Sequence, residues 1–305
     1  MKIILSLPIL LLLVFSCSSD KIKNNGNQNN IQQETLQLTE FIPNLDNKLL
    51  EISGLMIYDN LLWGFNDSGG KNIIYAINLQ GEIEKEIEIE NAQNRDWESV
   101  TQDSTNIYIG DFGNNMGNRD NLCIYTIKKK DFNNEKLQIV TAEKINFSYA
   151  VQTNLNTSNQ STPYDCEAMV AFNNSLYIFS KNWQDFTTAV YKISTEAGSY
   201  ELSPLDTFEV NGLITGADIS PDNKQLALVG YQNYQSFIWL FSNFPENLFF
   251  KGDSRFFQLE NTTNMQTEGI CYSGNNTLLV SCERTSSFNQ QVFLFDISTI
   301  NNGTH

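Results

Sequence analysis

The chain has 305 residues, 41% of them hydrophobic and 12% aromatic, and a formal net charge of −16 at pH 7. Such an acidic chain is a poor partner for nucleic acid or anionic lipid surfaces, because like charges repel. Its single histidine, His305, lies in the polar stretch 301–305, which excludes a Ser-His-Asp triad and a zinc site with histidine ligands.

A short apolar segment comes first in chain order. Residues 3–15 are almost wholly apolar after Lys2, and Ser16 and Cys17 follow. A membrane-spanning helix needs about 20 apolar residues, so this run has the layout of a secretory signal instead. The small residue before Cys17 resembles the bacterial lipoprotein cleavage box, which implies a signal peptide over 1–16 and a lipid on Cys17. An ordinary signal peptide with a chance cysteine is the alternative.

The next segment is polar and rich in Asn and Gln. Residues 17–33 contain too few apolar side chains to form a core, so we expect a flexible tether after the lipidated cysteine. Residues 34–301 are enough for one large all-β domain, and 302–305 form a tail. The protein would then lie in the bacterial cell envelope, with the outer membrane as the preferred location.

Five segments of the domain share one pattern. Each has a polar or acidic start, a small residue, an apolar strand, a turn and a second apolar strand; they begin at Glu51, Asp96, Asp165, Ile214 and Gln266. A third strand follows at 72–79, 121–129, 189–194, 237–242 and 291–298. The first four segments add a fourth strand at 82–90, 142–150, 202–210 and 254–260.

This repeat predicts a single β-propeller. The aligned positions Ser53, Glu98, Glu167, Gly216 and Glu268 are 45, 69, 49 and 52 residues apart. Four short strands at such a period are typical of propeller blades. The last segment has only three strands, so we expect the strand over 34–42 to complete that blade and close the ring. We predict five four-stranded blades; six is the alternative, with the extra blade inside the long second unit.

A propeller gathers residues from every repeat at one mouth of its channel. The chain leading into each innermost strand and the end of each second strand lie on the same face. The first group supplies Asp96, Glu98, Asp165, Glu167 and Glu268. The second supplies Asn66, Asp67, Asp111, Asn114, Lys181, Glu283 and Arg284, with Trp183 just beyond. We expect these residues to form an acidic funnel.

Several motifs resemble a known family. The segment "ISGLMIYDNLLWGFNDSGGKNIIYAINLQGEIEKEI", with "DWESV", "YIGDFGNN", "TGADISPDNKQLALVGY" and "TEGI", is similar to the SdiA-regulated propellers and the related esterase-like-phytase propellers over residues 45–299. More distantly, the Glu-Gly strand start resembles gluconolactonase and regucalcin propellers. In those, a glutamate at this position binds a metal with Asn and Asp from other blades. The resemblance implies Glu268 as a ligand, with Glu98 and Glu167 at equivalent places.

Oxygen ligands of this kind suit Ca²⁺. Our candidate metal ligands are Glu98, Glu167, Glu268, Asp111 and Asn66. Our candidate contacts for a further ligand are Asp96, Asp165, Asp67, Asn114, Lys181, Trp183, Glu283 and Arg284. The alternative is structural: Lys181, Arg284 and Arg95 neutralise the carboxylates, or the carboxylates cap backbone N–H groups.

Two functions remain open from the sequence. The first is an envelope protein that binds a small-molecule or protein ligand at a mouth bearing Ca²⁺. The second is a metal-dependent hydrolase of lactones, esters or phosphoesters, in which the metal polarises the substrate and a carboxylate acts as base. In both cases we expect a monomer, attached to the membrane through Cys17, with no nucleic-acid partner.

Overall fold

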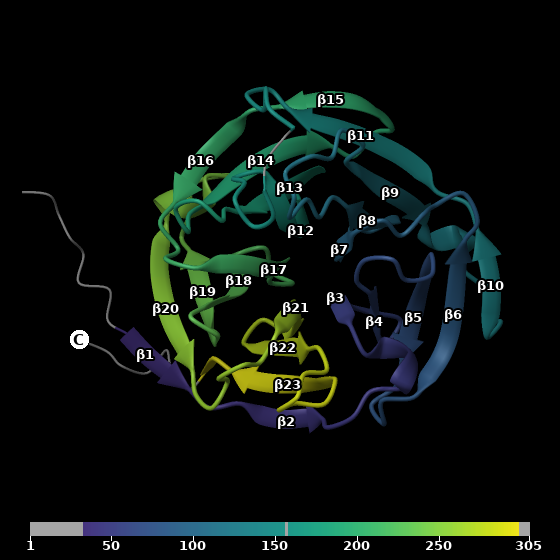
Figure 1. Cartoon of the computed structure of the whole chain (residues 1–305). Helices are drawn as coiled ribbons and strands as arrows, with labels where there is room; N and C mark the ends of the chain where they lie inside the picture. Colours follow the sequence, from purple (N-terminus) through teal and green to yellow (C-terminus); the bar gives the residue numbers. More distant parts are fainter. Residues whose placement is uncertain (1–32, 156–157, 299–305) are drawn as a thin grey trace, which may run out of the picture. The chain divides into compact units, whose positions relative to one another are not determined.

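The domain is a ring of five β-sheets. A computed structural model describes residues 33–155 and 158–298, and in it the sheets stand around a common axis like the blades of a propeller (Figure 1). The prediction of an all-β propeller with five blades is therefore confirmed. Between the strand that ends at Tyr149 and the strand that begins at Asp165, the described residues contain no further strand, so they form no sixth blade.

Each blade runs outward from an innermost strand that borders the channel. Blade 1 contains β3 (Ile52–Tyr58), β4 (Leu61–Asn66), β5 (Ile73–Ile77), β6 (Ile83–Ile89) and β10 (Leu137–Val140). Blade 2 contains β7 (Trp97–Gln102), β8 (Asn106–Asp111), β9 (Cys123–Lys128), β11 (Glu143–Tyr149) and β15 (Gly198–Leu202). Blade 3 contains β12 (Asp165–Phe172), β13 (Ser175–Lys181), β14 (Thr188–Ser194) and β16 (Pro204–Phe208).

The last two blades use strands from the start of the domain. Blade 4 contains β17 (Leu213–Ile219), β18 (Gln225–Gln232), β19 (Gln235–Ser242), β20 (Asp253–Leu259) and β1 (Gln33–Leu36). Blade 5 contains β21 (Thr267–Gly274), β22 (Thr277–Cys282), β23 (Gln291–Asp296) and β2 (Thr39–Ile42). Three short 3₁₀ helices complete the described elements: η1 (Asn47–Leu49), η2 (Lys129–Asp131) and η3 (Phe249–Lys251).

The ring closes as predicted, with one correction. β2 pairs antiparallel with β23 and completes blade 5, so the first and last parts of the domain share one sheet. The strand expected over 34–42 is in fact two strands. Its first half, β1, pairs parallel with β20 and belongs to blade 4.

The prediction of four strands in every blade is wrong for three blades. β10 adds to blade 1, β15 to blade 2 and β1 to blade 4, and each pairs parallel with the outer strand of its blade. In each case the added strand comes from the chain just before the outer strand of the next blade. The reason is physical: an outer strand has an edge of unpaired N–H and C=O groups, and the passing chain satisfies it.

Apolar side chains pack between neighbouring blades. The buried apolar residues fall into five clusters, one for each blade-to-blade interface of the ring. Trp63 of blade 1 and Trp97 of blade 2 share the cluster between those blades, and both are almost fully buried. Their indole N–H groups donate to backbone carbonyls of Tyr58 and Gln93. Both tryptophans are therefore part of the core and are not available to a ligand.

Some predicted features lie outside the described residues. These are the signal peptide at 1–16, Cys17 with all of the tether except Gln33, and the tail at 302–305. Among the residues that are described, no helix is long and apolar enough to cross a membrane.

Gly81, in the turn before β6 of blade 1, packs against the backbone of Asn44, which follows the ring-closing strand β2. Gly81 has φ +83°, and a Cβ there would lie 2.0 Å from the carbonyl oxygen of Asn44. We expect Gly81→Ala to lower the free energy of unfolding by ~2–5 kcal/mol, since backbone strain and overpacking add. Gly69 is the matched control, because its φ is +71° but no atom lies within 4 Å of the added Cβ.

Chemical denaturation of both variants measures the difference. Gly69→Ala should cost only the strain, about 1–2 kcal/mol. Equal losses in the two variants would contradict the close packing of the ring closure.

Candidate functional site

Every innermost strand is irregular at the same end. The pairing with the second strand slips by one residue between Ser53 and Met56, Trp97 and Ser99, Cys166 and Ala168, Ile214 and Gly216, and Thr267 and Gly269. A bulge of this kind leaves one residue unpaired and turns its side chain out of the regular alternation. Such bulges are frequent beside active sites.

In three blades the unpaired residue is a glutamate. Glu98, Glu167 and Glu268 are each passed over by the pairing of their strands, and all three line one cavity at this mouth of the channel. Blade 4 has Thr215 at the equivalent place, so the sequence alignment on Gly216 was one residue out of register. The Thr215 hydroxyl donates a hydrogen bond to the carbonyl oxygen of Thr267, so it is used within the protein.

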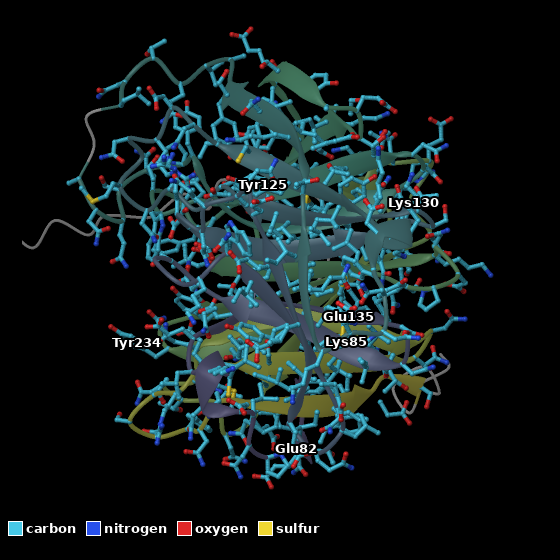
Figure 2. All side chains as sticks on the ribbon, turned by 90° about the vertical axis from the view of Figure 1, so that its right-hand side faces the viewer. Glu82, Lys85, Tyr125, Lys130, Glu135 and Tyr234 are labelled. Atoms are coloured by element: carbon cyan, nitrogen blue, oxygen red, sulfur yellow. The ribbon has the colours of Figure 1, made fainter. Side chains whose placement is uncertain are left out.

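The cavity is small and acidic. Its volume is about 150 Å³, and its lining includes residues from all five blades. The lining residues are Asp67, Glu98, Asn115, Gln160, Glu167, Lys181, Trp183, Tyr231, Gln266, Glu268 and Glu283. Figure 2 shows the two faces of the domain from the side: Tyr234 marks the face with this cavity, and Lys130 marks the opposite face.

Three carboxylates form the closest group. One oxygen from each of Asp67, Asp96 and Glu98 lies within 4.8 Å of the others, although Asp96 is not part of the cavity lining. Glu98 is only 4% exposed, and no described residue donates a hydrogen bond to its carboxylate. The backbone comes close here as well, since a Cβ on Gly113 would lie 2.3 Å from Glu98 Oε1 and 2.4 Å from Asp96 Oδ2.

Burial raises the pKa of the carboxyl groups around this mouth. The pKa of Asp96 rises to about 7, first because of burial and second because of the negative charge of Asp67. Burial and Asp67 also raise the pKa of Glu283 to about 8. Burial, with Glu167 and Asp67 next, holds the pKa of Glu98 well above its usual range. The mouth therefore holds protons near neutral pH unless another positive charge replaces them.

Lys181 is the cation of the cavity lining. Its Nζ donates to both carboxylate oxygens of Glu167 at 2.6 Å, and both side chains are buried. Burial works to lower the pKa of Lys181, but the negative charge of Glu167, together with Tyr231, Glu268 and Asp165, keeps this pKa well above its usual range. The same Nζ lies 5.0 Å from the Trp183 ring centroid and 5.4 Å from that of Tyr231. Lys181 thus pairs with one glutamate, whereas the carboxylates of Glu98, Glu268 and Glu283 accept no hydrogen bond from a described residue.

Four predicted site residues hold loops together. The Asp165 carboxylate accepts from the backbone N–H of Asn114 at 2.6 Å and from the Trp183 indole at 2.8 Å. Asp111 is paired with Arg119 at 2.8 Å. The side chains of Asn66 and Asn114 bond to backbone groups of the loops around them. The structural alternative, in which polar groups cap backbone N–H groups, describes these four.

The remaining predicted residues divide between the cavity and the surface. Trp183 and Glu283 line the cavity. Arg284 is exposed and is not among the lining residues, and neither is Arg95. Sequence reasoning missed the lining amides of Asn115, Gln160 and Gln266. They lie in loops or next to a strand start, where no periodic pattern marks them.

Comparisons with known proteins do not place this chain in a family. A scan of protein families found no match, and neither did a search of curated proteins. Among solved structures, the PQQ-bound aldose sugar dehydrogenase of Streptomyces coelicolor is similar with a TM-score of 0.49 and 8% identity, covering 85% of this chain and 96% of that one. A nidogen/laminin complex has a TM-score of 0.46 and 14% identity, covering 81% and 76%. A β-propeller domain from Myceliophteria thermophila has 0.40 and 8%, covering 81% and 97%.

These likenesses are too distant to say anything of function. The assignment as a β-propeller depends on the strand pairing of this chain itself, and the resemblance to SdiA-regulated propellers stays a prediction.

The raised pKa of Glu283 predicts a dependence of stability on pH. Between the pKa of an unfolded glutamate, about 4.3, and about 8, the folded chain holds a proton at Glu283 that the unfolded chain has released. The free energy of unfolding must therefore fall as pH rises through this window. Glu283→Gln removes that proton equilibrium, so the variant should lose less stability than the wild type between pH 4.5 and 8.5.

Urea denaturation in the presence of a chelator measures this difference. The two proteins should be most alike at the acidic end, where Glu283 is protonated and resembles glutamine. Parallel pH profiles would show that Glu283 titrates normally.

Proposed function

We propose that the protein binds a divalent cation, Ca²⁺ by preference, at the acidic mouth of its channel. The observation that carries the proposal is Glu98: the residue is only 4% exposed, its carboxylate accepts no hydrogen bond from a described residue, and one of its oxygens lies within 4.8 Å of carboxylate oxygens of Asp67 and Asp96. A buried carboxylate without a partner is costly unless it is protonated or faces a positive charge. A cation would supply that charge.

The residues present fit such an ion. Ca²⁺ takes six to eight oxygen ligands in a flexible arrangement, and Asp67, Asp96 and Glu98 would supply the carboxylate share. Water and nearby amides such as Asn115 and Gln160 would complete it. Four predicted ligands are left out of the proposed set. Asn66 and Asp111 are held in loops, Glu167 is paired with Lys181, and Glu268 is not in the group of carboxylates that lie within 4.8 Å of one another.

The rest of the cavity would receive a small group of a second ligand. Glu268, Glu283, Lys181, Trp183 and Tyr231 line it, which offers both signs of charge and two aromatic rings. A volume of about 150 Å³ holds an ion with its waters or one functional group, but not a whole metabolite. We therefore propose that the ion bridges the protein to a ligand or partner that covers the mouth.

Binding is better supported than hydrolysis. The hydrolase considered above would use a free carboxylate as the base beside the metal. Glu167, a central candidate, has both oxygens bonded to Lys181. The carboxyl group of Glu283, with a pKa of about 8, holds a proton at neutral pH and would act as an acid.

We also propose an envelope location with a lipid on Cys17, and this rests on residues 1–17 alone. Metabolic labelling with a radioactive fatty acid tests it in a bacterial host that processes lipoproteins. The wild type should take up label and sediment with membranes, whereas Cys17→Ser should do neither. Equal labelling of the two proteins would contradict lipidation at this residue.

Calorimetric titration of the full-length protein with Ca²⁺ tests the cation site. We expect saturable binding that releases protons at pH 7, because the ion displaces protons from carboxyl groups of raised pKa. The heat should therefore vary with the ionisation enthalpy of the buffer. Glu98→Gln should weaken binding by more than about tenfold.

The matched control is Glu88→Gln, which removes an exposed carboxylate from the outer strand β6. It should bind Ca²⁺ like the wild type. The Glu98→Gln variant should fold without loss of stability, since glutamine resembles a protonated glutamate. Binding that Glu98→Gln leaves intact, or no binding by the wild type, would contradict the proposal.

A further inference from the structure

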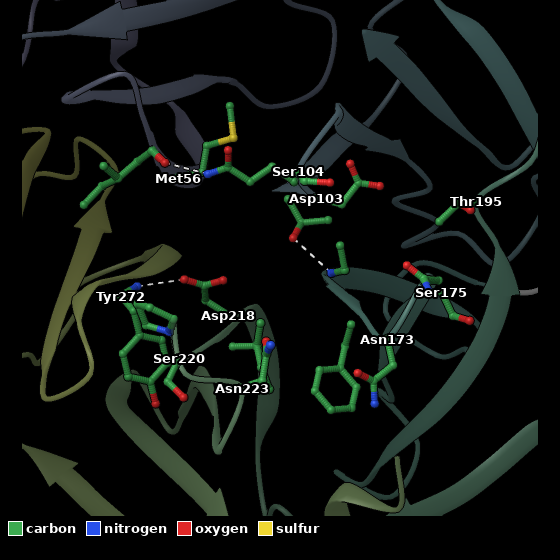
Figure 3. Close-up of a pocket in the computed structure, with 18 of the residues that line it drawn as sticks. Met56, Asp103, Ser104, Asn173, Ser175, Thr195, Asp218, Ser220, Asn223 and Tyr272 are labelled. Carbon is green, nitrogen blue, oxygen red and sulfur yellow. Dashed lines mark hydrogen bonds between the residues drawn. The ribbon is translucent and has the colours of Figure 1, made fainter. Parts of the chain in front are cut away.

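A second and larger cavity lies at the other mouth of the channel. It has a volume of about 680 Å³, and the ends of the innermost strands and the turns that follow them form its wall. All five blades contribute: Met56 from blade 1, Ser104 from blade 2, Ser175 from blade 3, Asp218 from blade 4 and Tyr272 from blade 5. Figure 3 shows these side chains around one central space. The volume lies within the range of about 300–1,000 Å³ that is typical of small-ligand pockets.

The lining of this cavity is mainly polar and carries two carboxyl groups, those of Asp103 and Asp218. Hydroxyl and amide side chains dominate it: Thr101, Gln102, Ser104, Asn173, Asn174, Ser175, Thr195, Ser220, Asn223 and Ser273. None of the residues lining it is Lys, Arg or His. An anionic ligand would therefore find no counter-charge in a protein whose net charge is already −16.

Both carboxyl groups in the lining already accept hydrogen bonds from the protein. Asp103 accepts from the backbone N–H groups of Thr105 and Asn106 and from the Tyr108 hydroxyl, so it belongs to its own turn. One oxygen of Asp218 accepts from the Tyr272 N–H at 2.7 Å, and its carboxyl group points toward the central space in Figure 3. Burial raises the pKa of Asp218 to about 7, so this group can donate as well as accept.

Other lining groups keep hydrogen-bonding capacity for a ligand. The Thr101 hydroxyl accepts from the Ala171 N–H, which leaves its own proton to donate. The Gln102 amide donates to the Ile57 carbonyl, which leaves its oxygen to accept. Phe172 and Tyr272 also line the cavity, but they are only 6% and 5% exposed, so each offers a ligand a small apolar part of its ring. Donors, acceptors and apolar faces are thus mixed around one space.

We propose that this cavity binds a neutral, polyhydroxylated ligand, a mono- or disaccharide in size and chemistry. Such a molecule offers many hydroxyl groups, each of which both donates and accepts, and has C–H faces that pack on aromatic rings. It needs no counter-charge, which distinguishes this mouth from the acidic one. The proposal is independent of the cation site, since no residue lines both cavities.

Saturation-transfer NMR with defined sugars tests the proposal on the full-length protein in a sugar-free detergent. The probes are glucose, galactose, mannose, N-acetylglucosamine, cellobiose and lactose, with gluconate and glucosamine as charged counterparts. We expect transfer to at least one neutral sugar, and weaker or no transfer to the anionic gluconate. Ser104→Trp places a large ring at the exposed rim of the cavity and should abolish the transfer.

Two control variants separate this site from the rest of the surface. Ser199→Trp adds the same ring on the exposed outer strand β15, and Glu98→Gln changes only the acidic mouth. Both should bind the sugar like the wild type. Absence of transfer to every neutral sugar, transfer only to the charged probes, or transfer that survives Ser104→Trp would each overturn the proposal.

Discussion

The structure depends on a bulge at the start of each innermost strand. Regular pairing would alternate side chains between the two faces of a blade. Neighbouring blades cover both of these faces. The extra residue breaks that alternation and directs Glu98, Glu167 and Glu268 toward the channel. Three buried carboxyl groups then meet one ammonium group, that of Lys181. This imbalance sets the chemistry of the mouth, because an unpaired buried charge must be protonated or compensated.

The blades that carry these bulges are linked into a ring by strands that pair with the sheet of another blade. β2 closes blade 5 with chain from the start of the domain, and β1, β10 and β15 each reach back to cover the edge of another blade. Parallel pairing at the rim thus joins neighbouring blades through the backbone, while apolar clusters join them through side chains. These connections between blades hold the walls of both cavities together, since each cavity takes its wall from all five blades.

The sequence predicted the ring of five blades, but it predicted the strand content of the blades and the site only in part. The repeat of four apolar strands with acidic starts predicted five blades and the face on which the carboxylates gather. It did not predict the added outer strands, because β10 and β15 are short and pair with distant chain, which no local pattern reveals. It also could not separate Glu98, which has no donor, from Asp165, which caps a loop. That difference lies in tertiary contacts and not in residue type.

The two mouths of the channel differ in charge because one is formed by the starts of the innermost strands and the other by their ends. The strand starts carry the bulged glutamates, whereas the strand ends run into turns of Ser, Asn and Thr. One domain therefore presents an acidic cavity on one face and, on the opposite face, a cavity lined mainly by hydroxyl and amide groups; the acidic one carries our central claim.

Crystals of the protein grown with Ca²⁺ test that claim most directly, through anomalous difference density recorded at long X-ray wavelength. The account predicts one peak at the acidic mouth, with oxygens of Glu98 and of Asp67 or Asp96 at about 2.3–2.6 Å from it. A map with no peak there, with Glu98 hydrogen-bonded as a protonated acid, would contradict it.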